Sequence, residues 1–280
     1  MSAGQTLRPL SDWPLAERQG IRGVMTDIDD TLTTAGAITP EALAALADLR
    51  ASGVPVVAIT GRPVGWSTAF AATWPVAAVV AENGAVALIP ESVNGLRPFK
   101  QADTLLSKLY QQDATTRTTN YARMQAIAQR VLAQVPGTSL AQDSPGRETD
   151  IAIDHSEFAD LDEATVAQVV ALLRAAGMTV TVSSIHINAW FGDHTKLSGA
   201  RWMVRELYGR HLDDELNRWV YVGDSTNDQL MFQRFPHSVG VANVHRFQAQ
   251  LTHLPRYVTP SERGAGFAEV ARSVLQGKLT

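Results

Sequence analysis

The sequence of 280 residues contains no cysteine, which excludes disulfide bridges, thiolate metal sites and a cysteine nucleophile. It also has no excess of basic residues, since 24 Lys and Arg are set against 28 Asp and Glu and the net charge is −4. A chain of this charge has no global positive field that would attract nucleic acid or an anionic membrane. We therefore expect no nucleic-acid partner.

Long apolar runs are also missing. No stretch reaches the roughly 18 consecutive apolar residues that indicate a membrane-spanning helix. Residues 1–20 lack the apolar centre of a secretory signal, although "LSDWPL" within them could either pack as an N-terminal arm or be disordered. We expect a cytoplasmic protein with no membrane association, present as a monomer or a homodimer.

What the sequence does contain is a regular alternation of strand and helix signals. Apolar runs of strand length lie at 21–25, 54–59 and 76–81, and helical patterns lie between them at 39–53 and 64–74. Strands that are apolar through most of their length are typical of a parallel sheet covered on both faces. This pattern predicts an α/β fold with a doubly wound, Rossmann-like parallel sheet.

The alternation is interrupted in the middle of the chain and resumes near residue 196. The interrupting section has helix and strand signals of its own, enough for a separate layer of roughly 100 residues. We therefore predict a core made of residues 1–86 and 191–280, with a smaller α+β domain inserted at 87–190.

In an open parallel sheet, ligands bind beyond the carboxyl ends of the strands. Candidate site residues follow three of the predicted strands. Asp27 and Asp29 follow the first, Thr60, Gly61 and Arg62 the second, and Asp224, Asn227 and Asp228 a late one. Lys196 starts the helix after the insertion.

The four aspartates of this set would meet at one edge of the sheet, where their mutual repulsion requires a cation. All-oxygen ligands suit Mg²⁺, which keeps water ligands and bridges to phosphate. The hydroxyl of Thr60 and the ammonium group of Lys196 suit phosphoryl oxygens, and backbone N–H groups near Gly61 could complete an anion site. Together these groups favour phosphoryl transfer.

Each element taken alone has an ordinary structural explanation. Two aspartates after a strand are often turn residues, and "TGR" is common turn chemistry. "GDSTND" could be a helix N-cap, and a single lysine at a helix start is usually solvated. The joint occurrence of all four elements, each at a predicted strand end or helix start, favours a functional site.

These residues resemble a known family. The segments 27–31 ("DIDDT"), 59–62 ("ITGR") and 223–228 ("GDSTND"), together with Lys196, resemble the four motifs of haloacid dehalogenase-superfamily phosphatases. Supporting matches are "AENGA" at 81–85, "GVAN" at 240–243 and "GAGFAEV" at 264–270. An insertion between the second and third motifs looks like the cap domain of the Cof-like subgroup, which includes sucrose-phosphatase-like, mannosylglycerate-phosphate phosphatase-like and phosphomannomutase enzymes.

The resemblance implies roles for the catalytic residues. Asp27 matches the nucleophile, which would form an aspartyl-phosphate. Asp29 matches the general acid that protonates the leaving oxygen and then activates water. Thr60 and Lys196 match the groups that hold the transferring phosphoryl group, and Lys196 also screens Asp27.

The remaining motif residues are implied to bind metal or phosphate. Asp224 would be a metal ligand beside Asp27 and the backbone carbonyl of Asp29, and Asp228 would orient a metal-bound water or Lys196. The other implied phosphate-binding residues are Gly61, Arg62 and Asn227. Asp30 stands where the family commonly has glycine, and we expect its side chain to point away.

The resulting hypothesis is a Mg²⁺-dependent phosphomonoesterase that hydrolyses a small phosphorylated metabolite, most plausibly a sugar phosphate. A phosphomutase would use the same groups but return the phosphoryl group to its substrate. A phospho-accepting signalling module of the receiver type also combines clustered Asp, Thr and Lys. In that module, however, the accepting Asp follows a middle strand and no large insertion is expected.

The stretch "SSIHINAW" (183–190) alternates, so His186 and Asn188 should lie on one face. They could hydrogen-bond a sugar, or they could simply form the solvent face of an antiparallel sheet. Trp190 is expected in core or hinge packing, and His194 could be either a hinge contact or a surface residue.

Overall fold

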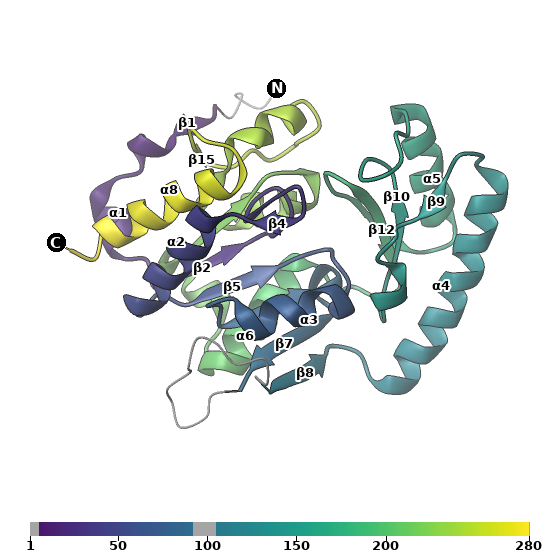
Figure 1. Ribbon diagram of the computed structural model, residues 1–280, viewed down its shortest axis with the longest axis horizontal. Coiled ribbons are helices and arrows are strands. Elements are labelled where there is room, and N and C mark those ends of the chain that lie inside the picture. Colours follow the sequence, from purple (N-terminus) through teal and green to yellow (C-terminus); the bar gives the residue numbers. More distant parts are fainter. Residues whose placement is uncertain (1–5, 92–104, 280) are drawn as a thin grey trace.

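The computed structural model describes residues 6–91 and 105–279 of the chain. A nine-stranded sheet with helices on both faces forms the larger part, and a four-stranded sheet with two helices lies beside it (Figure 1). The predicted doubly wound α/β core with a smaller α+β domain is confirmed.

The order of the large sheet is β1-β15-β14-β13-β2-β5-β6-β7-β8, and it is parallel from β1 to β6. Its strands are β1 (Arg8–Pro9), β15 (Tyr257–Val258), β14 (His237–Gly240), β13 (Trp219–Gly223), β2 (Gly23–Thr26), β5 (Val56–Ile59), β6 (Ala78–Ala81), β7 (Val86–Pro90) and β8 (Leu106–Tyr110). A short hairpin, β3 (Thr33–Thr34) and β4 (Ala37–Ile38), follows β2.

Successive residues of the central strands point to opposite faces and enter two separate apolar clusters. In β2, Val24 packs on the face covered by α2, α3 and α8, whereas Met25 packs on the face covered by α6 and α7. The helices are α1 (Leu15–Gln19), α2 (Pro40–Ala51), α3 (Val64–Thr73), α6 (Lys196–Tyr208), α7 (Gln229–Arg234) and α8 (Arg263–Gln276). Burial on both faces explains why these strands are apolar through their whole length.

Helix α2 begins as its sequence predicts. The Oγ1 atom of Thr39 accepts a hydrogen bond of 3.2 Å from the N–H of Ala42, and Pro40 occupies the first helical position. The loop that carries the first motif therefore ends at a well-defined helix N-terminus.

The smaller sheet has the antiparallel order β11-β12-β10-β9, and an apolar cluster joins it to its two helices. Its elements are α4 (Ala114–Gln134), β9 (Ser139–Leu140), β10 (Ile151–Asp154), α5 (Glu163–Ala175), β11 (Thr179–Val182) and β12 (His186–Trp190). We call residues 114–190 the cap.

Strands β7 and β8 belong to the large sheet and not to the smaller one. Strands β7 and β8 add antiparallel to the edge of the large sheet, so the core sheet extends to Tyr110. The boundaries 86/87 and 190/191 stay a prediction, and a first boundary near residue 111 fits the observed sheets better.

The N-terminal segment from residue 6 packs as an arm rather than remaining separate. Strand β1 pairs in parallel with β15. Trp13 is buried, and its ring stacks on Tyr257 with 5.9 Å between the ring centroids. The arm thereby covers an edge of the core sheet.

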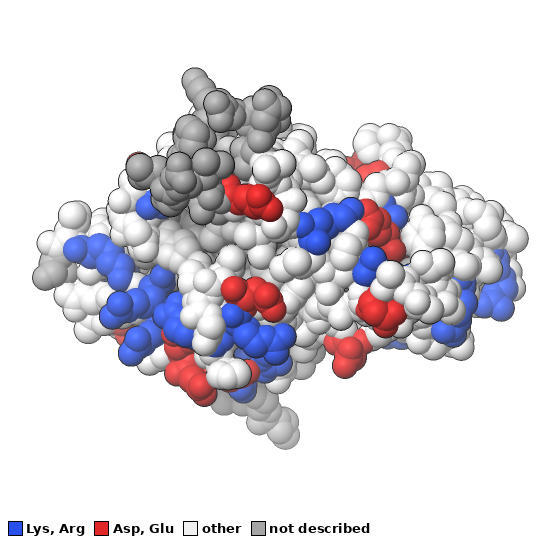
Figure 2. All heavy atoms as spheres, turned by 90° about the horizontal axis from the view of Figure 1, so that it is seen from below, with Lys and Arg blue, Asp and Glu red and all other residues white. Residues whose placement is uncertain are grey.

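Figure 2 shows Lys and Arg side chains gathered toward the core end of one face, with Asp and Glu side chains among them. Ion pairs account for some of this mixing across the protein, since Asp213 pairs with both Arg201 and Arg234. Within the part of the chain that the structure describes, no helix combines the length and apolarity needed to cross a membrane.

Candidate active site

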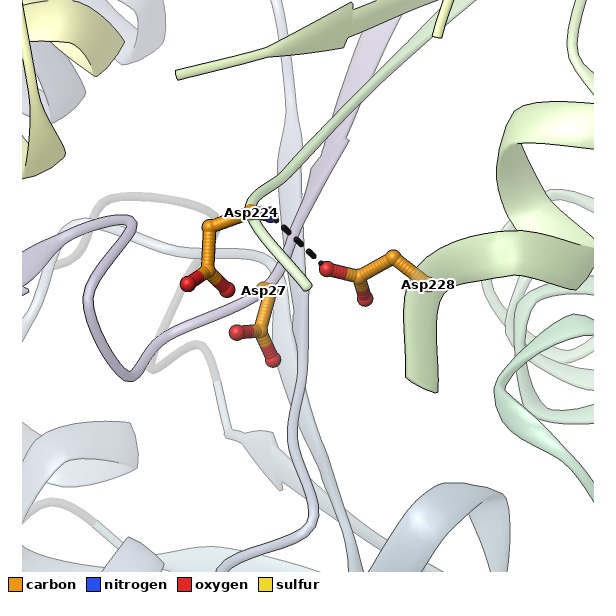
Figure 3. Close-up of side chains that lie close together, drawn as sticks. All are labelled: Asp27, Asp224 and Asp228. Carbon is orange, nitrogen blue, oxygen red and sulfur yellow. Dashed lines mark hydrogen bonds between the residues drawn. The ribbon is translucent and has the colours of Figure 1, made fainter. Parts of the chain in front are cut away.

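Two strands that are neighbours in the sheet bring distant parts of the chain together. Thr26 of β2 is paired with Val222 of β13, and the N–H of Asp27 donates to the carbonyl of Val222 at 2.9 Å. Asp27 and Asp224 follow these strands directly, and Asp228 lies in the next turn. One carboxylate oxygen from each of the three lies within 4.8 Å of the others (Figure 3). Asp29, the fourth aspartate expected to meet them, does not belong to this group.

Asp228 is occupied by hydrogen bonds on both oxygens. Its Oδ1 accepts from Lys196 Nζ at 2.7 Å and from the Tyr221 hydroxyl. Its Oδ2 accepts from the backbone N–H groups of Asp224 and Ser225 at 2.9 and 3.2 Å. This arrangement orients Lys196 and leaves Asp228 with little remaining capacity for a metal.

Asp224 is less fully hydrogen-bonded than Asp228. Its Oδ2 accepts from Asn243 at 3.0 Å, but its Oδ1 is buried and has no hydrogen-bond partner among the described residues. A buried carboxylate oxygen without a partner is costly, and a hard cation removes that cost. The residues present therefore fit Mg²⁺, with Asp224 and Asp27 as the side chains that would hold it.

The Lys196 ammonium group joins Asp27 to Asp228. Its Nζ lies 2.7 Å from Asp27 Oδ1 and 2.7 Å from Asp228 Oδ1, and all three side chains are buried. Burial raises the pKa of Asp27 to about 8, against the opposing effect of Lys196. Although burial acts to lower the pKa of Lys196, Asp228 and Asp27 raise it above its ordinary value, so the lysine stays charged.

This electrostatics predicts a pH-dependent response to Mg²⁺. The folded-state pKa values of Asp27 and Asp224 are raised mainly by burial, so the folded protein binds their protons more tightly than the unfolded chain. Without metal, the contribution of Asp27 to stability is present below about pH 4 and is lost as the pH rises through about 8. The contribution of Asp224 changes with pH in the same direction. We expect the melting temperature of the metal-free protein to fall over this window.

Mg²⁺ should raise the melting temperature more at pH 8 than at pH 5, because the cation replaces the protons. At a concentration 100-fold above its Kd, the stabilisation is about 2.7 kcal/mol. Differential scanning calorimetry with and without Mg²⁺ at both pH values measures the effect. An equal shift at both would contradict this account.

The second motif places Thr60, Gly61 and Arg62 after β5, next to the first motif. Thr60 Oγ1 accepts from the N–H of Arg62 at 3.0 Å and lies 3.5 Å from Asp29 Oδ2. Arg62 Nε donates to Asp29 Oδ1 at 3.0 Å. Burial raises the pKa of Asp29 even though Arg62 acts to lower it, which suits a group that must carry a proton.

The predicted facing of β12 is confirmed, and the solvent-face alternative is wrong. His186 and Asn188 are 2% and 1% exposed, whereas Ile187 packs into the cap's apolar cluster. Asn188 Nδ2 donates to the Gly61 carbonyl at 3.3 Å. His186 Nε2 lies 2.8 Å from a carboxylate oxygen of Glu157. The buried polar face exists because the cap lies against the core at this point.

Trp190 and His194 form the packed connection between the cap and α6. Both are buried, their rings stack at 5.2 Å, and Trp190 Nε1 donates to the carbonyl of His194 at 3.1 Å. Burial lowers the pKa of His194 to about 4. Trp190 therefore packs in the core of the cap, one of the two expected possibilities, and His194 is a buried contact of Trp190 rather than a surface residue.

A pocket lies between the strand ends and the cap. Most of its lining is polar, and it contains both predicted catalytic aspartates and the predicted cap residues: Asp27, Asp29, Gly61, Arg62, Ser183, Ser184, Ile185, His186, Asn188 and Asn227. Asp30, by contrast, points away and pairs with Arg263 at 2.9 Å, as expected.

Sequence reasoning missed several residues that shape the site. Asn243 bonds Asp224 and the Asp30 carbonyl, and the "GVAN" segment after β14 could have identified it. Glu82 of "AENGA" is buried and accepts from Val64 N–H in the core and from Thr149 in the cap. The other missed residues are Tyr221, Asp143 and Glu157.

Solved structures with the same overall fold cover nearly the whole chain. A protein from Thermoplasma acidophilum aligns with a TM-score of 0.66 and 17% identity, covering 91% of this chain and 99% of its own. Sucrose-phosphatase from Synechocystis sp. PCC6803, solved with sucrose and phosphate, aligns with a TM-score of 0.61 and 15% identity over 90% and 97%. The HAD subclass IIB sugar phosphatase BT4131 aligns with a TM-score of 0.59 and 13% identity over 92% and 98%.

No curated protein sequence matches the chain. A family model described as haloacid dehalogenase-like hydrolase matches residues 24–134, which include the first two motifs. Residues 24–134 are therefore similar to haloacid dehalogenase-like hydrolases. The predicted family resemblance and the prediction of an enzyme are borne out by this match. The roles of the individual site residues stay predictions.

Proposed function

We propose that this protein is a haloacid dehalogenase-superfamily enzyme, a Mg²⁺-dependent phosphomonoesterase that hydrolyses a small phosphorylated metabolite, a sugar phosphate, through an aspartyl-phosphate. One observation carries the proposal. A buried carboxylate, Asp27, lies 2.7 Å from Lys196 and beside the acidic cluster of Asp224 and Asp228, at the floor of a pocket that the cap covers. We further propose that the enzyme acts in the cytoplasm as a monomer or homodimer.

In the first half-reaction, an oxygen of Asp27 attacks phosphorus and the bond from phosphorus to the substrate's ester oxygen breaks. Asp29 donates its proton to that leaving oxygen. Lys196 and the Thr60 hydroxyl would bind the oxygens of the transferring phosphoryl group, and Lys196 would offset their charge. The product alcohol leaves, and Asp27 carries the phosphoryl group.

In the second half-reaction, the ionised Asp29 takes a proton from water, whose oxygen attacks the phosphorus of the aspartyl-phosphate. The bond between phosphorus and the Asp27 oxygen breaks, which releases inorganic phosphate and restores both carboxyl groups. When bound, Mg²⁺ neutralises negative charge on the phosphoryl oxygens and on the carboxylates that hold it.

A sugar phosphate is favoured by the lining of the pocket. The Ser183, Ser184, His186 and Asn188 side chains can exchange hydrogen bonds with substrate hydroxyl groups. Two of the proteins with a similar fold are described as a sucrose-phosphatase and a sugar phosphatase. These facts support a polyol leaving group.

The proposal is tested by measuring phosphate release from a panel of phosphorylated metabolites with Mg²⁺ present. We expect inorganic phosphate from one or more sugar phosphates. A phosphomutase would instead convert its substrate to an isomer that keeps the phosphate. An isomerised product without phosphate release would therefore refute hydrolysis as the main reaction.

The loss of turnover on replacing Asp29 by Asn should depend on the leaving group of the substrate. An amide cannot donate the proton, so turnover of an alkyl or sugar phosphate should fall by ~10²–10⁴. The leaving oxygen of an aryl phosphate with an acidic phenol needs less protonation, so the rate of the first step should fall less on that substrate. Comparison of kcat on the two substrates measures the effect, and an unchanged rate on the alkyl phosphate would contradict the role of Asp29.

A further inference from the structure

Arg62 lies between the proposed general acid and the cap. Its Nε donates to Asp29 Oδ1 at 3.0 Å, on the core side. On the cap side, one terminal nitrogen donates to Asp143 at 3.1 Å and to Glu157 at 3.2 Å, and the other donates to Glu157 at 2.7 Å. A single buried guanidinium group thus joins three carboxylates across the pocket.

This guanidinium group is held in one orientation. It lies over the ring of Trp66, 5.0 Å from the ring centroid, and the side chain of Arg62 is 7% exposed. A guanidinium is planar and rigid, so the direction of its Nε–H is tied to the direction of its terminal N–H groups. The carboxylates of the cap therefore influence how Arg62 meets Asp29.

Glu157 is held in place by a dedicated loop. The carboxylate of Asp154 accepts from the backbone N–H groups of Ser156, Glu157 and Phe158 at 3.1, 2.9 and 3.0 Å. The loop therefore turns Glu157 toward the pocket, where His186 Nε2 also contacts it at 2.8 Å. Burial acts to raise the pKa of Glu157, but His186 and Arg62 lower it to about 2, so the group is ionised at neutral pH.

We infer that Glu157 is a positioning residue that acts through Arg62 to keep Asp29 aligned with the leaving oxygen when the cap lies on the core. The inference rests on the proposed function. The cap carboxylates engage the terminal nitrogens and leave only Nε for Asp29. Without Glu157, Arg62 can offer a second N–H to Asp29, and the resulting bidentate pair draws the acid away from the leaving oxygen.

The test compares Glu157→Gln with wild type on two substrates with Mg²⁺ present, an alkyl phosphate and an aryl phosphate. On the alkyl phosphate, which depends on the acid, kcat should fall about 10- to 100-fold, within the range for general acid catalysis. KM should change less than about threefold, and the aryl phosphate should lose less than about threefold in kcat.

Glu148→Gln is the matched control. Glu148 is also a cap carboxylate that contacts the core, through Lys108 and Tyr110 at 2.5 Å each, and its side chain makes none of the contacts to Arg62 described above. Its substitution should leave the ratio of the two rates as in wild type. Melting temperatures of all variants separate loss of fold from loss of alignment.

If Glu157→Gln unfolds, Glu157→Asp is used instead, because it keeps the charge on a side chain one methylene shorter. Its kcat on the alkyl phosphate should fall selectively, as for Glu157→Gln, but by a smaller factor. Equal losses on both substrates, or no loss on either, would overturn the inference and leave the proposed function intact. Failure of the wild-type protein to release phosphate from any substrate would refute the proposed function and the inference together.

Discussion

Replacement of Asp27 by Asn should abolish phosphate release. The amide is not a nucleophile at phosphorus, and it also removes the charge that Lys196 contacts at 2.7 Å. We expect kcat to fall by about 10⁴-fold or more, on the scale seen when a catalytic nucleophile is removed. A coupled assay for inorganic phosphate on the best substrate of the panel measures this loss.

The fold should survive this substitution. Burial raises the pKa of Asp27 to about 8, so the ionised carboxylate is unfavourable in the metal-free protein and a neutral amide should not lower its melting temperature. Asp30→Asn is the matched control, because that side chain pairs with Arg263 outside the pocket. Full activity of Asp27→Asn, with wild-type activity of the control, would remove the assignment of the nucleophile.

Removal of Mg²⁺ should have an effect of similar size. With a chelator present, the negative charges of the phosphoryl group and the acidic cluster are no longer balanced, and turnover should fall by at least roughly 10³-fold, equivalent to about 4 kcal/mol. Addition of excess Mg²⁺ should restore activity. Activity that persists after complete removal of divalent cations would contradict the account of the metal.

The Asp224→Asn variant tests where Mg²⁺ binds. Asp224 Oδ1 is the buried oxygen without a partner among the described residues, and an amide there is a weaker metal ligand. The variant should need a much higher Mg²⁺ concentration for half-maximal activity, and titration calorimetry should show weaker Mg²⁺ binding. Asp213→Asn, on the protein surface, should change neither value.

The sequence predicts the core well because its signals are local and repeat along the chain. Alternate residues of β2 and β5 are buried on opposite faces, which requires apolar side chains throughout and marks both strands. The convergence of Asp27 and Asp224 also follows from general geometry, because the carboxyl ends of neighbouring parallel strands share one edge.

The edge of the core sheet is less predictable. Residues 86–90 form an apolar run that suits either an antiparallel edge strand or the first strand of an inserted domain. Only the pairing of β7 with β6 and β8 decides between these possibilities. That pairing depends on tertiary contacts that the local pattern does not encode.

The polar residues of the cap are the least predictable. Alternation along β12 separates His186 from Ile187 but does not say which face the core covers. Glu157 lies in an irregular loop, and its partner Arg62 is 95 positions away in the chain. A charged loop residue ordinarily faces solvent, so only the docking of the cap on the core assigns Glu157 to the pocket.

The most direct test of the central claim is chemical trapping of the phosphorylated enzyme. The protein is mixed with its substrate and Mg²⁺, quenched in acid during turnover, and digested for peptide mass spectrometry. We expect a phosphorylated peptide in which the modified residue is Asp27. Phosphate release at the normal rate with the label on another residue would contradict the account.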